Sequence, residues 1–127
     1  MKIGFVGLGN VGGKLAHSLL RNKFELTVRD LDKDHTKEFQ NKGAAIANSP
    51  KELAQQVDLI ITCLPSPKIC AEVMEAEDGV INGLTKNKIW LEMSTTDESE
   101  IKRLGKLVKE RDAIPLDGPV SGGQNLI

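Results

Sequence analysis

A glycine-rich turn near the N-terminus constrains the fold of this chain more than any other feature. The residues Gly7-Leu8-Gly9-Asn10-Val11-Gly12 match the pattern G-x-G-x-x-G and directly follow a short apolar run, Lys2–Val6. An amphipathic stretch, Asn10–Arg21, begins inside the motif. A strand that ends at such a turn and leads straight into a helix is typical of the βαβ unit that binds dinucleotides.

Each glycine of the motif has its own physical task. Gly7 permits the tight turn, Gly9 lets the backbone approach a pyrophosphate, and Gly12 lets the helix pack closely on the strand. The N-terminus of the helix adds unpaired N–H groups and a partial positive charge. A turn that binds no ligand is the alternative. The residues predicted to bind the cofactor pyrophosphate are Gly7, Leu8, Gly9, Asn10, Val11 and Gly12.

A carboxylate, Asp30, follows the second predicted strand, Glu25–Arg29. An acid at this position accepts hydrogen bonds from the adenosine ribose, and its charge, with Asp32 and Asp34 nearby, opposes a 2′-phosphate. Arg29 could accept such a phosphate, but alternation along a strand predicts that it points to the opposite face. The sequence therefore favours NAD over NADP, and a solvated turn is the alternative for Asp30.

The rest of the chain alternates β-branched runs with amphipathic stretches. Further strands are predicted at 44–47, 58–64, 88–93 and 114–116, and further helices at about 33–43, 50–57 and 67–77 and after residue 97. Ser49-Pro50 and Ser66-Pro67 are typical helix starts, with a capping serine and a proline in the first turn. Six strands separated by helices predict an α/β fold, a single Rossmann-type domain over residues 1–127 with a doubly wound, mainly parallel sheet.

The segment Leu64-Pro65-Ser66-Pro67 follows the fourth predicted strand. In doubly wound sheets, ligands lie beyond the carboxyl ends of the strands, near the point where the strand order reverses. Leu64 and Pro65 are therefore expected to flank the adenosine or its ribose. A helix cap with no further role is the alternative.

Composition limits the partners that this chain can have. The net charge is −1, with 17 basic and 18 acidic residues dispersed along the chain, so neither nucleic acid nor an anionic membrane is an expected partner. No apolar run is long enough for a signal peptide or a membrane span, and a cytoplasmic protein is expected. Cys63 and Cys70 are expected to be free thiols, and no metal site is predicted.

Four segments, in this order, resemble motifs of the β-hydroxyacid dehydrogenase family, which includes 3-hydroxyisobutyrate, tartronate-semialdehyde and 6-phosphogluconate dehydrogenases. They are residues 3–12, residues 64–66, Glu92-Met93-Ser94-Thr95-Thr96-Asp97, and Asp117-Gly118-Pro119-Val120-Ser121-Gly122-Gly123. The resemblance implies that Thr95 contacts the nicotinamide half of the cofactor. It also implies a substrate loop at 117–123, in which Ser121, Gly122 and Gly123 hold the substrate carboxylate. Gly118 replaces the alanine usual in the family.

The same resemblance implies an NAD-dependent dehydrogenase that oxidises a short β-hydroxy acid. A lysine of the family shuttles the hydroxyl proton from an all-helical second domain, which also forms the oligomer. The sequence ends at Ile127, so this lysine and this domain are expected outside the chain, and the full protein is expected to be a homo-oligomer. No catalytic residue is assigned within the chain, which is expected to bind cofactor without turnover.

Three other classes share part of this pattern. A stand-alone NAD sensor or interaction module keeps the glycine turn but does not need the 121–123 segment. An S-adenosylmethionine-binding Rossmann domain also has a glycine-rich first loop and an acid after its second strand. A flavoprotein places its Rossmann unit in a longer chain.

Overall fold

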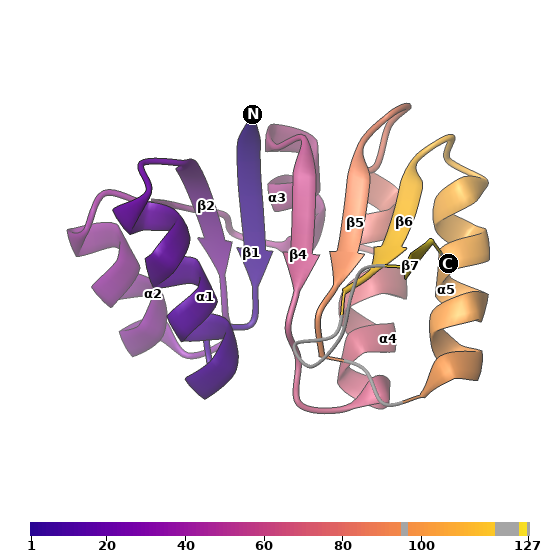
Figure 1. Ribbon diagram of the computed structural model, residues 1–127, viewed down its shortest axis with the longest axis horizontal. Helices are drawn as coiled ribbons and strands as arrows, with labels where there is room; N and C mark the ends of the chain where they lie inside the picture. The colour runs from indigo at the N-terminus through magenta and orange to yellow at the C-terminus, as the bar shows by residue number, and fades with distance from the viewer. Residues whose placement is uncertain (95–96, 119–124, 127) are drawn as a thin grey trace.

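The computed structural model describes residues 1–94, 97–118 and 125–126, which form one seven-stranded sheet (Figure 1). The strand order is β3-β2-β1-β4-β5-β6-β7, with β1 to β6 parallel and β7 antiparallel to β6. The predicted doubly wound, mainly parallel α/β sheet is confirmed, and β7 is an addition to the six predicted strands. The strand bounds are β1 (Lys2–Val6), β2 (Glu25–Arg29), β3 (Ala45–Ile46), β4 (Leu59–Thr62), β5 (Ile89–Glu92), β6 (Ile114–Asp117) and β7 (Asn125–Leu126).

Helices cover both faces of this sheet. In Figure 1, α1 and α2 lie over one face, and α3, α4 and α5 lie over the other. None of the helices in the described ranges is long and apolar enough to span a membrane. The helix bounds are α1 (Asn10–Arg21), α2 (Lys33–Asn41), α3 (Pro50–Gln56), α4 (Pro67–Glu75) and α5 (Glu98–Lys109), with a short 3₁₀ helix, η1 (Val80–Gly83).

The capping residues read from the sequence start the helices. The Ser49 hydroxyl accepts a hydrogen bond from the Glu52 N–H at 3.0 Å, and the Ser66 hydroxyl accepts one from the Ile69 N–H at 3.2 Å. Each bond satisfies one of the N–H groups that the first turn of a helix leaves unpaired. At the other end of a helix, α2 stops just before Gly43, whose φ of 103° favours glycine.

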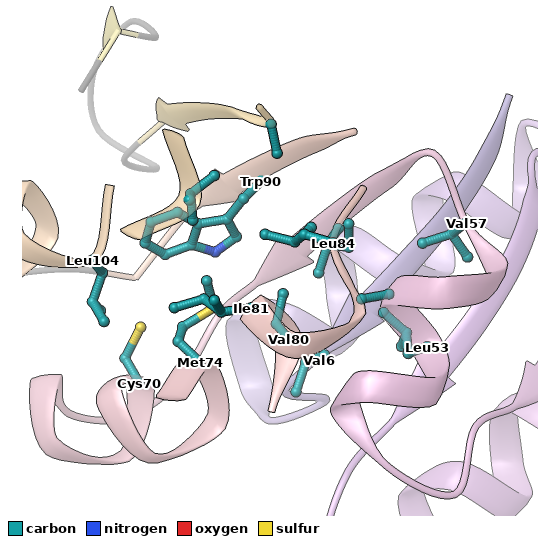
Figure 2. Close-up of a cluster of buried hydrophobic side chains, with 14 of the residues drawn as sticks. Val6, Leu53, Val57, Cys70, Met74, Val80, Ile81, Leu84, Trp90 and Leu104 are labelled. Carbon is teal, nitrogen blue, oxygen red and sulfur yellow. The ribbon is translucent and has the colours of Figure 1, made fainter. Parts of the chain in front are cut away.

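Alternation along the strands divides the apolar side chains between two cores. On β1, Ile3 and Phe5 face the core under α1 and α2, whereas Val6 faces the core under α3, α4 and α5. In the second core, the Trp90 indole of β5 lies among side chains from α4 and α5, as Figure 2 shows. Because both faces are buried, the central strands are apolar on both sides, which explains the continuous apolar run of β4.

The topology places a crevice at the carboxyl ends of β1 and β4. After β1, the chain builds the sheet toward β2 and β3, whereas β4, β5 and β6 extend it on the other side of β1. All six parallel strands end at the same edge, the lower edge in Figure 1. The crevice outside this edge, where the strand order reverses, is where ligands of open α/β sheets bind.

Candidate functional site

The glycine turn joins the ends of three strands. Gly7 has a φ of 101°, and its N–H donates a hydrogen bond to the Arg29 carbonyl oxygen at 3.1 Å. A Cβ at Gly7 would overlap the carbonyl oxygen of Cys63, just beyond β4. A Cβ at Gly12 would overlap the carbonyl oxygen of Gly7. Glycine is therefore required at both positions for β1, β2, β4 and α1 to approach one another.

Gly9 differs from the other two glycines because it faces open space. A Cβ at Gly9 would meet no other group within 4 Å, and Gly9 is the N-cap of α1 with no side chain capping the helix. The first turn of α1 therefore keeps N–H groups that no capping side chain satisfies. An open space against such groups fits an anion such as a pyrophosphate.

Asp30 connects this turn to the end of β2. Its carboxylate accepts hydrogen bonds from the Leu8 N–H at 2.6 Å and from the Asp32 N–H at 2.8 Å. The side chain of Asp30 is 16% exposed and lines the crevice. Each carboxylate oxygen accepts more than one hydrogen bond, so Asp30 keeps acceptor capacity for hydroxyl groups of a ligand.

A histidine on α2 lies between two carboxylates beside the crevice. His35 Nδ1 is 3.6 Å from Asp30 Oδ2, and His35 Nε2 is 3.6 Å from Asp32 Oδ2. Both distances exceed that of a hydrogen bond, and Nδ1 is buried without a hydrogen-bond partner among the described residues. Arg29 also lines the crevice beside Asp30, although strand alternation predicts opposite faces for the two side chains.

The crevice is a cavity of about 970 Å³, near the upper end of the range for small-molecule sites. It extends from Asp30 and His35, past the glycine turn, to Met93 and Ser94 beyond β5. The structure thus brings together most of the residues predicted from the sequence. Predicted residues that line it are Gly7, Gly9, Asn10, Val11, Gly12, Asp30, Leu64 and Pro65.

The remaining predicted residues have other positions. Leu8 is only 4% exposed and packs in the core under α1 and α2, and its N–H is bonded to Asp30. Thr95 and the segment Ser121-Gly122-Gly123 lie outside the described residues. No group of metal-binding side chains occurs in the described part of the chain.

Sequence reasoning assigned no role to several apolar residues of the lining. Leu31, directly after Asp30, is 87% exposed, and Val11 and Ile69 are 49% and 36% exposed. Large apolar side chains left open beside a cavity fit a planar, weakly polar group such as adenine. Their signal in the sequence was weak, because single exposed apolar residues are common on protein surfaces.

A buried carboxyl group, Glu92, lies behind the other end of the cavity. It is fully buried, and its oxygens accept hydrogen bonds from Thr62, Cys70 and Ser94. Burial first, and then the charge of Glu92, raise the pKa of the half-buried Cys63 thiol, which lines the cavity. Burial and the charges of Glu92 and Glu98 also raise the pKa of Asp117.

Comparison with known proteins agrees with this geometry. The family model for the NAD-binding domain of 6-phosphogluconate dehydrogenase matches residues 2–126. The chain is 39% identical to mitochondrial 3-hydroxyisobutyrate dehydrogenase of Mus musculus and 36% identical to that of Homo sapiens, in each case over 121 residues. These residues make up 95% of this chain and 36% of each relative, so the chain spans about a third of their length.

A solved structure of a related protein has the same fold as this chain. The 3-hydroxyisobutyrate dehydrogenase of Salmonella typhimurium is 27% identical, with a TM-score of 0.87. The match covers 97% of this chain and 43% of that one. The relatives named 3-hydroxyisobutyrate dehydrogenase share this NAD(P)-binding Rossmann domain. The glycine turn, the cavity at the strand-order reversal and the match over residues 2–126 lead to one conclusion. The chain belongs to the family of NAD-binding domains of 6-phosphogluconate dehydrogenase.

Proposed function

We propose that residues 1–127 form the cofactor-binding domain of an NAD-dependent dehydrogenase that acts on a short β-hydroxy acid. The observation that carries this proposal is the open space at Gly9, which faces the uncapped N-terminus of α1 in the same cavity as Asp30. The names of the relatives, 3-hydroxyisobutyrate dehydrogenases, support the substrate class.

NAD is the proposed cofactor in preference to NADP. Asp30 and Asp32 place two carboxylates where the adenosine ribose would lie, and a 2′-phosphate would meet both charges. The positive charge of Arg29, which also lines the cavity, reduces this repulsion. We therefore expect NAD to be preferred over NADP while NADP is still accepted weakly.

In the proposed reaction, bound NAD⁺ would supply the acceptor for the hydride from the carbinol carbon of the substrate. The chain itself would bind and orient the cofactor and the substrate. Among the residues that line the cavity, Gly9 at the N-terminus of α1 would hold the pyrophosphate, and Asp30 would accept hydrogen bonds from the ribose hydroxyls. Leu64 and Pro65 would flank the adenosine. The proposed roles of Thr95 at the nicotinamide half and of Ser121, Gly122 and Gly123 at the substrate carboxylate rest on their family motifs.

The proton of the substrate hydroxyl needs a separate acceptor. No lysine is among the described residues that line the cavity. We propose that a lysine outside these 127 residues removes this proton, in a homo-oligomeric full-length protein. The chain by itself is then a binding domain without turnover, because general acid–base catalysis contributes about 10²–10⁴-fold to such reactions.

Titration of the chain with NADH, NADPH, S-adenosylmethionine and FAD tests the binding proposal. We expect saturable binding of NADH, weaker binding of NADPH and none of the other two. Saturation by S-adenosylmethionine alone would identify a methyl-donor domain instead. Incubation of the chain with NADH and short semialdehydes tests the catalytic part, because turnover above about 1 s⁻¹, the low end of ordinary enzymes, would place the proton donor within these residues.

A further inference from the structure

Glu92 is a carboxyl group that the chain buries completely, in a strand that is otherwise apolar. It is the last residue of β5, after Ile89, Trp90 and Leu91. Glu92 Oε2 accepts hydrogen bonds from Thr62 Oγ1 at 2.7 Å and from Cys70 Sγ at 2.8 Å. Glu92 Oε1 accepts from the Ser94 N–H at 2.7 Å and from the Ser94 hydroxyl.

The direction of these hydrogen bonds follows from the chemistry of the donors. The Trp90 indole can only donate, and it donates to Thr62 Oγ1 at 2.9 Å, which leaves the hydrogen of the Thr62 hydroxyl for the bond to Glu92. The Ser94 backbone N–H can also only donate. Both oxygens of Glu92 therefore act as acceptors, which is the pattern of a carboxylate. All its hydrogen-bond donors among the described residues are uncharged, so its negative charge has no cationic partner among them.

This uncompensated charge lies behind one end of the cavity. Ser94, which Glu92 holds by both its N–H and its hydroxyl, lines the cavity together with Met93. The charge of Glu92 acts on groups in the cavity wall, where, after burial, it helps to raise the pKa of the Cys63 thiol. Asp30 and His35 mark the opposite, adenosine end. In a doubly wound sheet, the strands on the β4–β5 side hold the second nucleotide of a dinucleotide.

We propose that Glu92 biases the site toward the oxidised cofactor, because its buried negative charge favours the cationic nicotinamide ring of NAD⁺ over the neutral ring of NADH. The inference rests on the proposed function, and it assigns Glu92 a role as a positioning residue that acts through charge and through Ser94. A full charge that acts through partly desolvated protein changes a binding constant by about twofold to tenfold over the distances within a nucleotide site.

The test is the ratio of two dissociation constants, Kd for NAD⁺ over Kd for NADH, measured in the unchanged chain and in Glu92→Gln. The glutamine keeps the shape of the side chain and removes its charge. We expect the ratio to rise by about twofold to tenfold. The control is Glu110→Gln, which removes an exposed carboxylate at the end of α5, outside the cavity lining. Because solvent screens Glu110, its ratio should stay within about twofold of the unchanged chain.

A purely structural role would weaken the binding of both cofactors in proportion and leave the ratio unchanged, which would overturn the inference. An equal rise in Glu110→Gln would overturn it too. If Glu92→Gln does not fold, Glu92→Met replaces it, because methionine is similar in size, carries no charge and needs no hydrogen-bond donor: the same rise in the ratio supports the inference, and an unchanged ratio overturns it. Binding of neither cofactor to the unchanged chain would refute the proposed function itself, so the two failures are distinct.

Discussion

The Asp30 side chain has two tasks at once. Its hydrogen bond from the Leu8 N–H fixes the glycine turn against β2, and the same carboxylate lines the cavity. The bond from the Asp32 N–H limits its rotation further. Asp30 is therefore held in place before any ligand binds, and less conformational freedom has to be lost on binding.

The two tasks of Asp30 are separable by measurement. We expect Asp30→Ala to weaken NADH binding by at least tenfold, because the loss of a hydrogen bond to a charged group costs about 1.5–3 kcal/mol. Loosening of the turn weakens NADH and NADPH alike, whereas removal of the charge favours NADPH. The ratio of NADH to NADPH affinity, measured by titration, should therefore fall toward one in Asp30→Ala. The control, Glu110→Gln, removes an exposed charge at the end of α5, outside the cavity lining, and should keep the ratio of the unchanged chain. Equal affinities in the unchanged chain would contradict this prediction.

The glycines of the turn should respond to substitution in opposite ways. Gly9→Val adds a side chain in open space, so we expect the fold to survive while dinucleotide binding is lost. Gly12→Ala forces a Cβ against the Gly7 carbonyl, and we expect it to lower the free energy of unfolding by about 1–3 kcal/mol. Thermal unfolding and NADH calorimetry on both variants check the pair. Unchanged NADH affinity in Gly9→Val would refute the role given to this turn.

The secondary-structure elements show where sequence patterns suffice and where they do not. Helices α3 and α4 start at the predicted Ser-Pro pairs, because a cap is a local interaction that the sequence spells out. The fourth strand, predicted over 58–64, is only Leu59–Thr62, although the N–H groups of Asp58 and Cys63 on either side still donate hydrogen bonds to the backbone of β1. The two-residue β7 and the single turn η1 are too short to show any periodicity in the sequence. β7 pairs with β6, and η1 packs against α3 and α4.

The two serine caps should contribute similar amounts to stability. We expect Ser49→Ala and Ser66→Ala each to lower the free energy of unfolding by about 1 kcal/mol, since each leaves one helix N–H without its side-chain partner. Urea unfolding measures the change. Ser18→Ala, inside α1, is the control and should cost nothing, because alanine favours the helix interior. A loss as large in Ser18→Ala would show that the caps are not responsible.

At the scale of the whole molecule, only one end of the cavity could be predicted from the sequence. This is the proposed adenosine end, which follows from the contiguous glycine motif and from Asp30. The Glu92 network does not follow from the sequence, because Thr62 and Cys70 are 30 and 22 residues away from Glu92 along the chain. Only the three-dimensional packing of β4, β5 and α4 brings them together. The only sign of this network in the sequence is a charged residue, Glu92, at the end of an apolar strand. Glu92 is also the first residue of the 92–97 family motif, which gives no indication of the network.

This buried network should make stability depend on pH in the alkaline range. Burial first, and then the charge of Glu92, raise the pKa of the Cys70 thiol far above that of an exposed thiol, about 8.5. The unfolded chain therefore loses the Cys70 proton at a pH where the folded chain keeps it. This contribution is complete below about pH 8.5 and decreases above it, by up to about 1.4 kcal/mol per pH unit.

Urea unfolding between pH 7.5 and 9.5 measures this slope. Cys70→Ser is the control, since its hydroxyl still donates to Glu92 but does not titrate there. We expect the decline in the free energy of unfolding to be shallower in Cys70→Ser than in the unchanged chain. Identical slopes would show that the thiol ionises as easily in the folded chain as in the unfolded one.

The outer strands of the sheet determine how the molecule meets its neighbours. Both edges described here, β3 and β7, are only two residues long, and β6 carries Pro115, which has no N–H to offer next to the β7 edge. A strand from another molecule would find few backbone groups in a row to bind. Concentrated solutions of the folded chain should therefore resist stacking into fibrils through strand pairing, and self-association of this domain would have to proceed through its helical faces.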